Sequence, residues 1–317
     1  MTQRQSNPFP YSDSNKRYHT FDYYLRRRFG RKCARITLDA GFSCPNVSGP
    51  AGNGGCVYCT LPQIVGRTPP PLCEQFAKRR EEEQKKWPGS ASIVYFNAGT
   101  NTFAPVERLR ALYEEALSFP DVAGMAVATR ADALSDEVVE LLREIDKRTF
   151  LVVELGLQSI HDVTARRVNR GHDYADFLRG YSRLSGLNIC VHIINGLPGE
   201  DRAMMLDTAR ELARLRPMMV KIHMLYITRG TPISLLWESG KLRMLTREEY
   251  VETVCDQLEL LPPETVIGRL TGDGDRSSLL APEWSLKKLV VMNEIDKLLY
   301  SRNSFQGLKY ANEAERE

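Results

Sequence analysis

The sequence has no long hydrophobic run and almost no net charge. No stretch approaches the roughly 20 consecutive apolar residues of a membrane span, and the polar first residues lack a signal-peptide core. We therefore expect no membrane segment. The 43 Lys and Arg residues nearly balance the 40 Asp and Glu residues, and a net charge of +3 does not by itself imply a polyanionic partner.

Internal repeats and low-complexity segments are also absent. A chain of 317 residues with 42% hydrophobic and 26% charged residues is typical of a globular protein with a large core. The seven cysteines are odd in number, and three of them cluster in a pattern typical of metal sites. This argues against a disulfide framework and favours a reducing compartment, so we expect a cytoplasmic protein.

The clustered cysteines lie in one loop, residues 41–60, whose Gly, Pro and Asn residues argue against a regular helix or strand. Cys44, Cys56 and Cys59 follow the spacing C-x11-C-x2-C. Cys56 and Cys59 can present two thiolates from a single turn, and the Gly-rich spacer lets Cys44 fold back as a third ligand. Three thiolates suit a 4Fe–4S cluster with one open iron, where a substrate or cofactor can coordinate.

A structural zinc site is the alternative for these cysteines. Zinc in such sites normally takes four protein ligands, so Cys33 or Cys73 would have to be the fourth. Cys33 precedes a predicted strand and Cys73 follows three prolines, and neither is paired like the second half of a zinc knuckle.

The cysteine spacing resembles the cluster-binding loop of the radical S-adenosylmethionine (SAM) enzymes. Their usual spacing is C-x3-C-x2-C, and the longer first gap resembles the branch with the Elongator catalytic subunit and the YhcC/YtqA-like bacterial proteins. The resemblance covers roughly residues 16–307. It implies that Cys44, Cys56 and Cys59 hold three irons of a 4Fe–4S cluster, while SAM chelates the fourth through its amino and carboxylate groups.

Short apolar runs alternate with amphipathic segments along the middle of the chain. The predicted strands are residues 35–38, 92–97, 124–128, 150–155, 188–194 and 219–225. The predicted helices between them are residues 74–86, 106–118, 136–146, 175–185 and 202–215. Strands that alternate with helices pair in parallel through right-handed crossovers. Six such units fall short of a closed eight-stranded barrel, so we expect an α/β fold with an open, partial (βα)6 barrel.

Three segments are predicted. Residues 1–34 form a basic, aromatic N-terminal arm, residues 35–230 form the barrel with the cysteine loop, and residues 231–317 form a C-terminal extension. Within the extension, Thr246 has the spacing of a capping box, and residues 285–302 form a final helix.

The arm combines basic and aromatic residues, a composition typical of nucleic-acid contacts. Guanidinium groups bind phosphates, and aromatic faces stack on unpaired bases. The alternative is a surface helix whose aromatic residues pack on the protein while its arginines are merely solvated. The predicted nucleic-acid-binding residues are Arg26, Arg27, Arg28, Arg31 and Lys32.

Residues at the strand ends are expected to bind SAM, because ligands of parallel α/β folds lie at the carboxyl ends of the strands. Glu154 is ionisable inside an apolar strand, and a ribose hydroxyl or the SAM ammonium would give its carboxylate a partner. Of Arg166, Arg167 and Arg170, we favour Arg167 as the clamp on the SAM carboxylate. With the resemblance, the predicted cofactor-binding residues are Tyr58, Asn97, Ala98, Gly99, Thr100, Glu154, Gln158, Arg167, Asn195, Gly196 and His223.

Several of these residues also have a structural interpretation. Tyr58 can simply pack, and a lone histidine on a strand, such as His223, is usually a satisfied core residue. Arg130 and Asp132 resemble an element of the same branch, but they can equally form a structural ion pair.

The resemblance also implies a reaction. One electron enters the cluster and cleaves SAM into methionine and a 5′-deoxyadenosyl radical, which abstracts hydrogen from the substrate. For the substrate it implies tRNA, with remodelling of a carboxymethylaminomethyl-type side chain on a wobble uridine. The expected partners are tRNA and an electron donor such as flavodoxin or ferredoxin. Two alternatives stay open: a radical SAM enzyme acting on a small metabolite or a protein, and a non-enzymatic nucleic-acid-binding protein with a structural zinc.

Overall fold

The computed structural model describes residues 7–49, 52, 54–272 and 274–310, and it divides into two compact units. The first, here called the cysteine unit, contains Leu25–Leu157 and Ala165–His192. The second, here called the C-terminal unit, contains Met1–Tyr24, Gln158–Thr164 and Ile193–Glu317. The predicted division into arm, barrel and extension stays a prediction.

The cysteine unit is built on parallel strands. Strands β1 (Cys33–Leu38), β2 (Ala91–Phe96), β3 (Val122–Thr129) and β4 (Phe150–Gln158) pair in that order, and β5 (Asn188–Asn195) begins beside β4. All six residues of β2 and all but the last of β4 are buried, as expected for strands covered on both faces. The parallel α/β architecture predicted from the sequence is confirmed.

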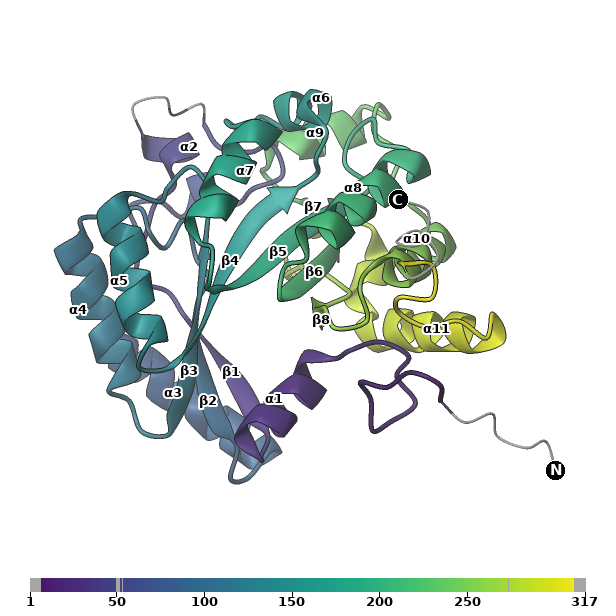
Figure 1. Ribbon diagram of the computed structural model, residues 1–317. Helices are drawn as coiled ribbons and strands as arrows, with labels where there is room; N and C mark the ends of the chain where they lie inside the picture. Colours follow the sequence, from purple (N-terminus) through teal and green to yellow (C-terminus); the bar gives the residue numbers. More distant parts are fainter. Residues whose placement is uncertain (1–6, 50–51, 53, 273, 311–317) are drawn as a thin grey trace. The chain divides into compact units, whose positions relative to one another are not determined.

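Helices follow the strands of this unit as predicted. Figure 1 shows α3 (Leu72–Lys86), α4 (Val106–Leu117) and α5 (Asp136–Asp146) along one side of strands β1 to β3. The remaining helical segments of the unit are α2 (Pro45–Ser48), η1 (Leu61–Gln63), α7 (Tyr174–Arg183) and the larger part of α1 (Phe21–Phe29). Helix α6 (Asp162–Arg167), which was not predicted, contributes its last three residues.

Helix α5 illustrates how the local sequence determines an element. Its apolar residues recur on one face, and the buried ones include Val138, Leu142 and Ile145. Ser135 precedes the first turn in an extended conformation, and its hydroxyl accepts a hydrogen bond from the Val138 backbone N–H at 3.3 Å. This cap satisfies a donor that the helix itself cannot pair.

Replacing the cap residue should therefore weaken the fold. We expect Ser135→Ala to lower the free energy of unfolding by about 1 kcal/mol, because the Val138 N–H loses its acceptor. Ser135→Asp should retain wild-type stability, since a carboxylate also accepts this bond and carries negative charge at the positive end of the helix dipole. Urea denaturation measures both variants, and an unchanged midpoint in Ser135→Ala would show that the cap contributes nothing.

The C-terminal unit continues the parallel pairing. The end of β5 is followed by β6 (Met219–Met224), which pairs in parallel with β8 (Val266–Arg269). Strand β8 was not assigned from the sequence, because it is short and contains Gly268. A Cβ atom at Gly268 would lie 2.7 Å from the Met219 sulfur, so the glycine allows the two strands to pack closely. Strands β7 (Ile227–Thr228) and β9 (Leu279–Ala281) form a separate antiparallel pair.

Helices α8 (Arg202–Leu215), α10 (Arg247–Leu260) and α11 (Lys288–Ser301) pack together in this unit, with α10 contacting both of the others (Figure 1). Helix α9 (Pro232–Glu238) and the short η2 (Glu283–Leu286) complete it. The predicted capping box at the start of α10 is present, with Thr246 and Glu249 bonding each other's backbone N–H groups. No helix in the described part of the chain is both long and apolar enough to cross a bilayer.

The first described residues pack into the C-terminal unit. Arg17, Tyr18 and His19 are buried, and the Arg17 guanidinium lies 5.1 Å from the centre of the Tyr300 ring. The His19 backbone N–H donates to the Gln306 side chain at 2.9 Å. The basic segment therefore begins as packed chain and becomes exposed only in the second half of α1.

Candidate cluster site

The cysteine loop follows β1 directly, and its local hydrogen bonds orient the three thiols. Cys44 immediately precedes α2, and its carbonyl accepts from the N–H groups of Val47 and Ser48. The Cys59 N–H donates to the Cys56 carbonyl at 2.9 Å, so these two residues belong to one turn, as predicted. Helix α2 corrects the expectation that the loop has no regular structure. Proline is favourable at the first helical position, where its missing N–H costs nothing.

The three thiols are free and electrostatically coupled. Cys56 is buried, while Cys44 and Cys59 are half-buried. The pKa of Cys59 is raised to about 11, chiefly by burial and in part by the neighbouring Cys56 and Cys44. The Leu61 N–H, 3.4 Å from the sulfur, acts in the opposite direction and lowers this pKa. Such repulsion between thiolates favours a cation or a positively charged cluster among them.

The spacing of the sulfurs bears on which metal they suit. Sulfurs that share one tetrahedral zinc lie roughly 4 Å apart, because each Zn–S bond is about 2.3 Å. Among the described residues, the three thiols do not form a set whose ligand atoms all lie within 4.8 Å of one another. Cys33 lies at the opposite end of β1 from the loop, and no four-cysteine set forms in the described ranges. The donor set fits a wider iron–sulfur cluster better than one zinc ion.

A buried arginine lies against the most buried thiol. Nη1 of Arg170 lies 3.8 Å from the Cys56 sulfur, and Nη2 donates to the Gly156 carbonyl at the end of β4. Arg130 donates to the Arg170 carbonyl at 2.9 Å and forms a two-point ion pair with Asp132. Burial alone would raise the pKa of Cys56, but the guanidinium groups of Arg170 and Arg130 outweigh it and lower this pKa. The site thus stabilises a thiolate at Cys56.

The segment that carries Arg170 also holds the cysteine loop in place. The Val57 N–H donates to the Val168 carbonyl at 3.0 Å, and the Asn169 amide donates to the Gly55 carbonyl at 2.8 Å. Asn46 returns a bond to the Asn169 carbonyl at 2.7 Å. These three contacts bring together residues more than a hundred positions apart in the sequence.

The loop after β2 packs against the residues that precede Cys44. Gly99 has φ +76°, and a Cβ atom there would lie 2.2 Å from the Phe42 carbonyl oxygen. The Thr100 N–H donates to the Ser43 carbonyl at 2.8 Å. Only glycine permits both this backbone conformation and this close approach. The predicted SAM-binding residues Asn97–Thr100 therefore lie beside the start of the cysteine loop.

Comparison with known families decides what this arrangement is. The Radical SAM superfamily model matches residues 46–212, more than half of the chain. The chain belongs to the radical SAM superfamily. The model of the Radical_SAM C-terminal domain matches residues 217–301. Members of this superfamily generally use a 4Fe–4S cluster and SAM, so the family predicted from the cysteine spacing is confirmed.

Three similar proteins place this radical SAM protein more closely. It is 46% identical over 308 residues to the uncharacterized protein YtqA of Bacillus subtilis, covering 96% of each chain. It is 26% identical over 154 residues to a tRNA uridine(34) acetyltransferase of Methanocaldococcus infernus, covering 47% of this chain and 28% of the relative. The structure of the Methanocaldococcus infernus Elp3 matches with a TM-score of 0.63 and 19% identity, over 86% of this chain and 64% of that one. The last likeness shows a shared fold.

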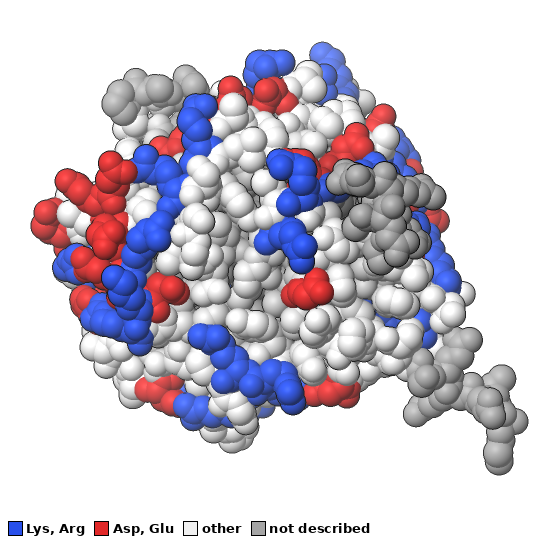
Figure 2. Space-filling model, viewed as in Figure 1, with Lys and Arg blue, Asp and Glu red and all other residues white. Residues whose placement is uncertain are grey.

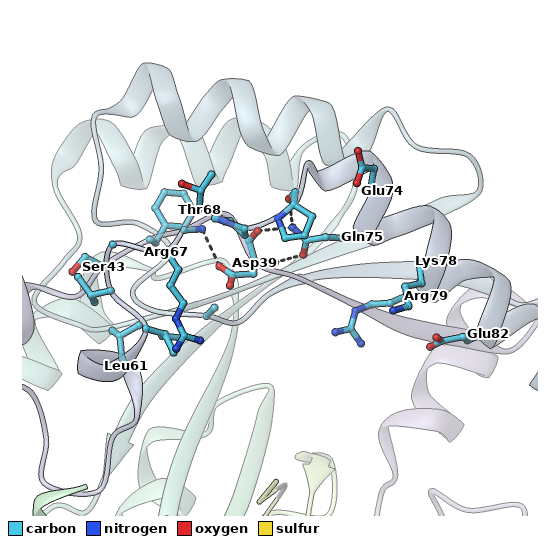
Figure 3. A pocket seen from close by; sticks show the side chains of 18 residues that line it. Asp39, Ser43, Leu61, Arg67, Thr68, Glu74, Gln75, Lys78, Arg79 and Glu82 are labelled. Carbon is cyan, nitrogen blue, oxygen red and sulfur yellow. Dashed lines mark hydrogen bonds between the residues drawn. The ribbon is translucent and has the colours of Figure 1, made fainter. Parts of the chain in front are cut away.

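A cavity of about 720 Å³ lies beside the cysteine loop of the radical SAM protein. Its lining includes Ser43, which precedes Cys44, and Leu61, which lies two residues after Cys59. Ala98, from the loop after β2, also lines it. Figure 3 shows Asp39 and Gln75 bonded to each other on its wall, together with Arg67 from the segment between η1 and α3. Its volume lies in the range typical of small-molecule sites. The sequence did not indicate this cavity, because its lining comes from three separate segments.

Glu154 and Tyr58, two predicted SAM-binding residues of the cysteine unit, lie close to other side chains of the protein. Glu154 is buried and lies 2.8 Å from His192 Nε2 and 3.7 Å from the Arg35 guanidinium. The partner that an isolated buried carboxylate requires is thus supplied by the protein itself. The Tyr58 hydroxyl lies near Cys56, and its pKa is raised well above the usual value, by burial and then by the Cys56 thiolate. The SAM contacts of both residues stay predictions.

Arg167 and Arg170 differ in their surroundings. Arg167 ends α6 and is exposed, whereas Arg170 follows in the next turn and is buried against Cys56. The sequence placed both among the candidate clamps and favoured Arg167. Nothing in the local pattern marks Arg170, because its burial depends on the cysteine loop that folds over it. Its role at Cys56 was missed.

The remaining predicted SAM-binding residues belong to the C-terminal unit. Asn195 is buried and exchanges two hydrogen bonds with Gln257, at 2.8 and 2.9 Å. Gly196 has φ +84°, Gln158 has φ +75°, and His223 is half-buried on β6. Their contacts with SAM stay predictions.

The basic residues of the predicted nucleic-acid surface differ in exposure. Arg26, Arg27 and Arg28 are all exposed in the last turns of α1, where Figure 2 shows basic side chains gathered. Arg31 pairs with Asp121, and the Lys32 ammonium lies 4.5 Å from the centre of the Trp87 ring. The three consecutive arginines therefore present the strongest positive charge of this segment to solvent.

His172 makes the stability of this site depend on pH. Burial lowers the pKa of His172 to about 4, and the nearby Arg170 and Arg130 lower it too. Between about pH 6.5 and pH 4 only the unfolded chain takes up this proton, so acid favours unfolding in that window. When the pH falls from about 7.5 to about 5, the free energy of unfolding should decrease in both proteins. We expect the decrease to be about 2 kcal/mol smaller in His172→Gln than in the wild type, because glutamine takes up no proton. Urea denaturation at both pH values measures this, and equal losses would contradict it.

Proposed function

We propose that this radical SAM protein binds a 4Fe–4S cluster through Cys44, Cys56 and Cys59 and cleaves SAM reductively. The observation that carries the proposal is the set of three coupled thiols in one loop, with no fourth cysteine joining them among the described residues. Three protein ligands leave one iron of the cluster without a protein ligand, where the amino and carboxylate groups of SAM would bind. A cluster held by these residues would supply one-electron reduction of SAM, which yields methionine and a 5′-deoxyadenosyl radical.

The residues of this chain prepare the site for that chemistry. Arg170 lowers the pKa of Cys56 and so favours the thiolate form that binds iron, and the Arg170 carbonyl accepts a hydrogen bond from Arg130. The burial of Cys56 and of the Tyr58 hydroxyl keeps water from one side of the site. Asn97–Thr100 offer backbone carbonyls beside the cysteine loop, and we assign them to the SAM ammonium.

For the substrate we infer tRNA, with a wobble uridine carrying a carboxymethylaminomethyl-type side chain as the target. A distant relative, 26% identical to this chain over 154 residues, is named a tRNA uridine(34) acetyltransferase. The exposed arginines at the end of α1 fit a phosphate backbone. An acidic redox protein of the flavodoxin or ferredoxin class would supply the electron.

Anaerobic reconstitution with iron and sulfide tests the reaction. A brown protein that converts SAM to 5′-deoxyadenosine in the presence of dithionite supports the proposal. A colourless protein that retains zinc and leaves SAM intact would instead support the non-enzymatic alternative. The iron content, measured by mass spectrometry, separates the two without reference to any substrate.

Nucleoside analysis of tRNA tests the substrate separately. A strain that lacks this protein should lose one modified uridine at the wobble position and regain it when the wild-type chain is supplied. A variant without Cys44 should fail to restore it. Unchanged tRNA nucleosides together with intact SAM cleavage would favour a small metabolite or a protein as the substrate.

A further inference from the structure

A second group of metal-binding side chains lies in the cysteine unit, apart from the cluster loop. Glu154 on β4 and Cys190 and His192 on β5 place a carboxylate oxygen, a thiol sulfur and an imidazole nitrogen within 4.8 Å of one another. Glu154 and Cys190 are fully buried, and the side chain of His192 is 16% exposed. In the described part of the chain this is the only such group.

Strand geometry brings these three side chains together. Strands β4 and β5 are neighbours, and the Asn188 amide bonds the Leu151 carbonyl across them at 2.9 Å. Cys190 and His192 are two residues apart, so both point to the same face of the sheet. Helix α4 covers the other face, where Phe96 contacts Tyr113 with ring centres 5.2 Å apart. Tyr95, the neighbour of Phe96, therefore points away from α4. The pKa of Tyr95 is raised well above its usual value, first by burial and second by the nearby charge of Glu154.

The surroundings hold the carboxylate in one orientation. The Arg35 guanidinium lies 3.7 Å from Glu154 Oε1 and 4.6 Å from the centre of the Tyr95 ring. The other oxygen, Oε2, faces His192 Nε2 at 2.8 Å. Metal-binding carboxylates commonly have a partner on their second oxygen, and here the Arg35 guanidinium is an ion-pair partner on that side. Oε2 is therefore positioned as a ligand, and the short contact with His192 need open only slightly to admit an ion.

The chemistry of the donors indicates which ion fits. One thiolate, one imidazole and one carboxylate are the ligand types of zinc and similar divalent transition metals, and the hard cations Mg²⁺ and Ca²⁺ avoid sulfur. The thiolate and the carboxylate together carry two negative charges, which match a divalent cation. Three protein ligands leave a fourth coordination position open. Because His192 is the partly exposed member of the group, solvent or substrate would reach this position from the side of His192.

We propose that Glu154, Cys190 and His192 bind a zinc-type divalent ion that keeps one coordination position open for water or for an oxygen or nitrogen atom of the substrate. The ion would orient and polarise the substrate atom on the same face of the sheet as Arg35 and Tyr95. Glu154 then contacts the ion through Oε2, in place of the predicted contact with SAM.

Titration with Co²⁺ tests the site, because Co²⁺ bound to a thiolate has a near-ultraviolet charge-transfer band and strong visible bands in tetrahedral sites. The protein to use is the full chain with Cys44, Cys56 and Cys59 all replaced by serine, so that the cluster ligands cannot contribute. We expect one equivalent of Co²⁺ to bind with both sets of bands. In this background Cys190→Ser should lose the charge-transfer band, and Glu154→Gln should weaken binding at least about 10-fold.

Cys255→Ser is the matched control, because Cys255 is also buried but lies on α10 of the C-terminal unit. It should leave the Co²⁺ spectrum unchanged. Absence of a saturable spectrum in the parent, or a charge-transfer band that persists in Cys190→Ser, would overturn the proposal and leave a metal-free hydrogen-bonded pair of Glu154 and His192.

The wild-type chain gives an independent measurement if the triple variant does not fold. After reconstitution with iron and added Zn²⁺, it should hold one zinc per chain that Cys190→Ala lacks, while the iron content stays equal. Equal zinc in the two proteins would contradict the site. Because iron and SAM cleavage are read separately, failure of this proposal is distinguishable from failure of the proposed cluster.

Discussion

Cys44→Ala is expected to abolish reductive SAM cleavage and to leave 5′-deoxyadenosine below about 1% of the wild-type amount. Loss of an outer-shell partner alone typically costs 10- to 100-fold in metal affinity or activity, and Cys44 is proposed as a direct ligand. Cys44 is half-buried at the start of α2, so its truncation leaves no large cavity in the core. The effect should therefore be one of chemistry and not of folding.

The measurement is anaerobic reconstitution followed by chromatography of 5′-deoxyadenosine, with iron content and thermal unfolding determined on the same sample. Cys73→Ala is the matched control, because this cysteine is exposed on α3 and outside the cluster loop. It should retain full cleavage and full iron content. Undiminished cleavage in Cys44→Ala would mean that another set of ligands holds the cluster.

Replacement of Arg26, Arg27 and Arg28 by glutamine should weaken tRNA binding about 10- to 100-fold at low salt and lower the salt dependence of binding. Each phosphate contact that is lost removes close to one unit from the slope of log K against log salt concentration. These arginines are exposed at the end of α1. SAM cleavage without tRNA should be nearly unchanged, because none of them belongs to the cluster site.

Filter binding or fluorescence anisotropy over a range of salt concentrations measures this effect. Arg110, Arg148 and Arg179 make a matched control, since they are also exposed but pair with Glu144, Glu114 and Asp176. Their replacement also removes three positive charges, from α4, from the turn after α5 and from α7. If both triple variants bind tRNA as the wild type does, the α1 arginines are ordinary surface residues.

Elements with a strong local signal were predicted well from the sequence. Helix α5 begins and ends at the predicted residues, because Ser135 caps it and its apolar residues repeat at helical spacing. The strands from β1 to β6 were each found within a few residues, since continuous apolar runs between helices indicate buried parallel strands. Strand β8 escaped notice because Gly268 weakens its β-propensity, and only its packing against Met219 makes a strand there favourable.

Pairings between distant residues could not be predicted in the same way. The sequence shows that Glu154 is a carboxylate in an apolar strand and needs a partner, but three different strands supply Arg35, Tyr95 and His192. Likewise, Arg170 meets Cys56 only because Asn46 and Asn169 fasten the cysteine loop over it. Such contacts depend on which strands are neighbours and on how loops close.

By itself, the sequence determined the three cysteines with their spacing, the alternation of strands and helices, and thereby the radical SAM family. These properties are local, since a ligand spacing or a period of buried residues is complete within a few turns of chain. The tertiary structure alone decided that Arg170 and not Arg167 lies at Cys56, and that Glu154 meets Cys190 and His192. The physical reason is that burial and charge at these positions arise from packing between segments far apart in the chain.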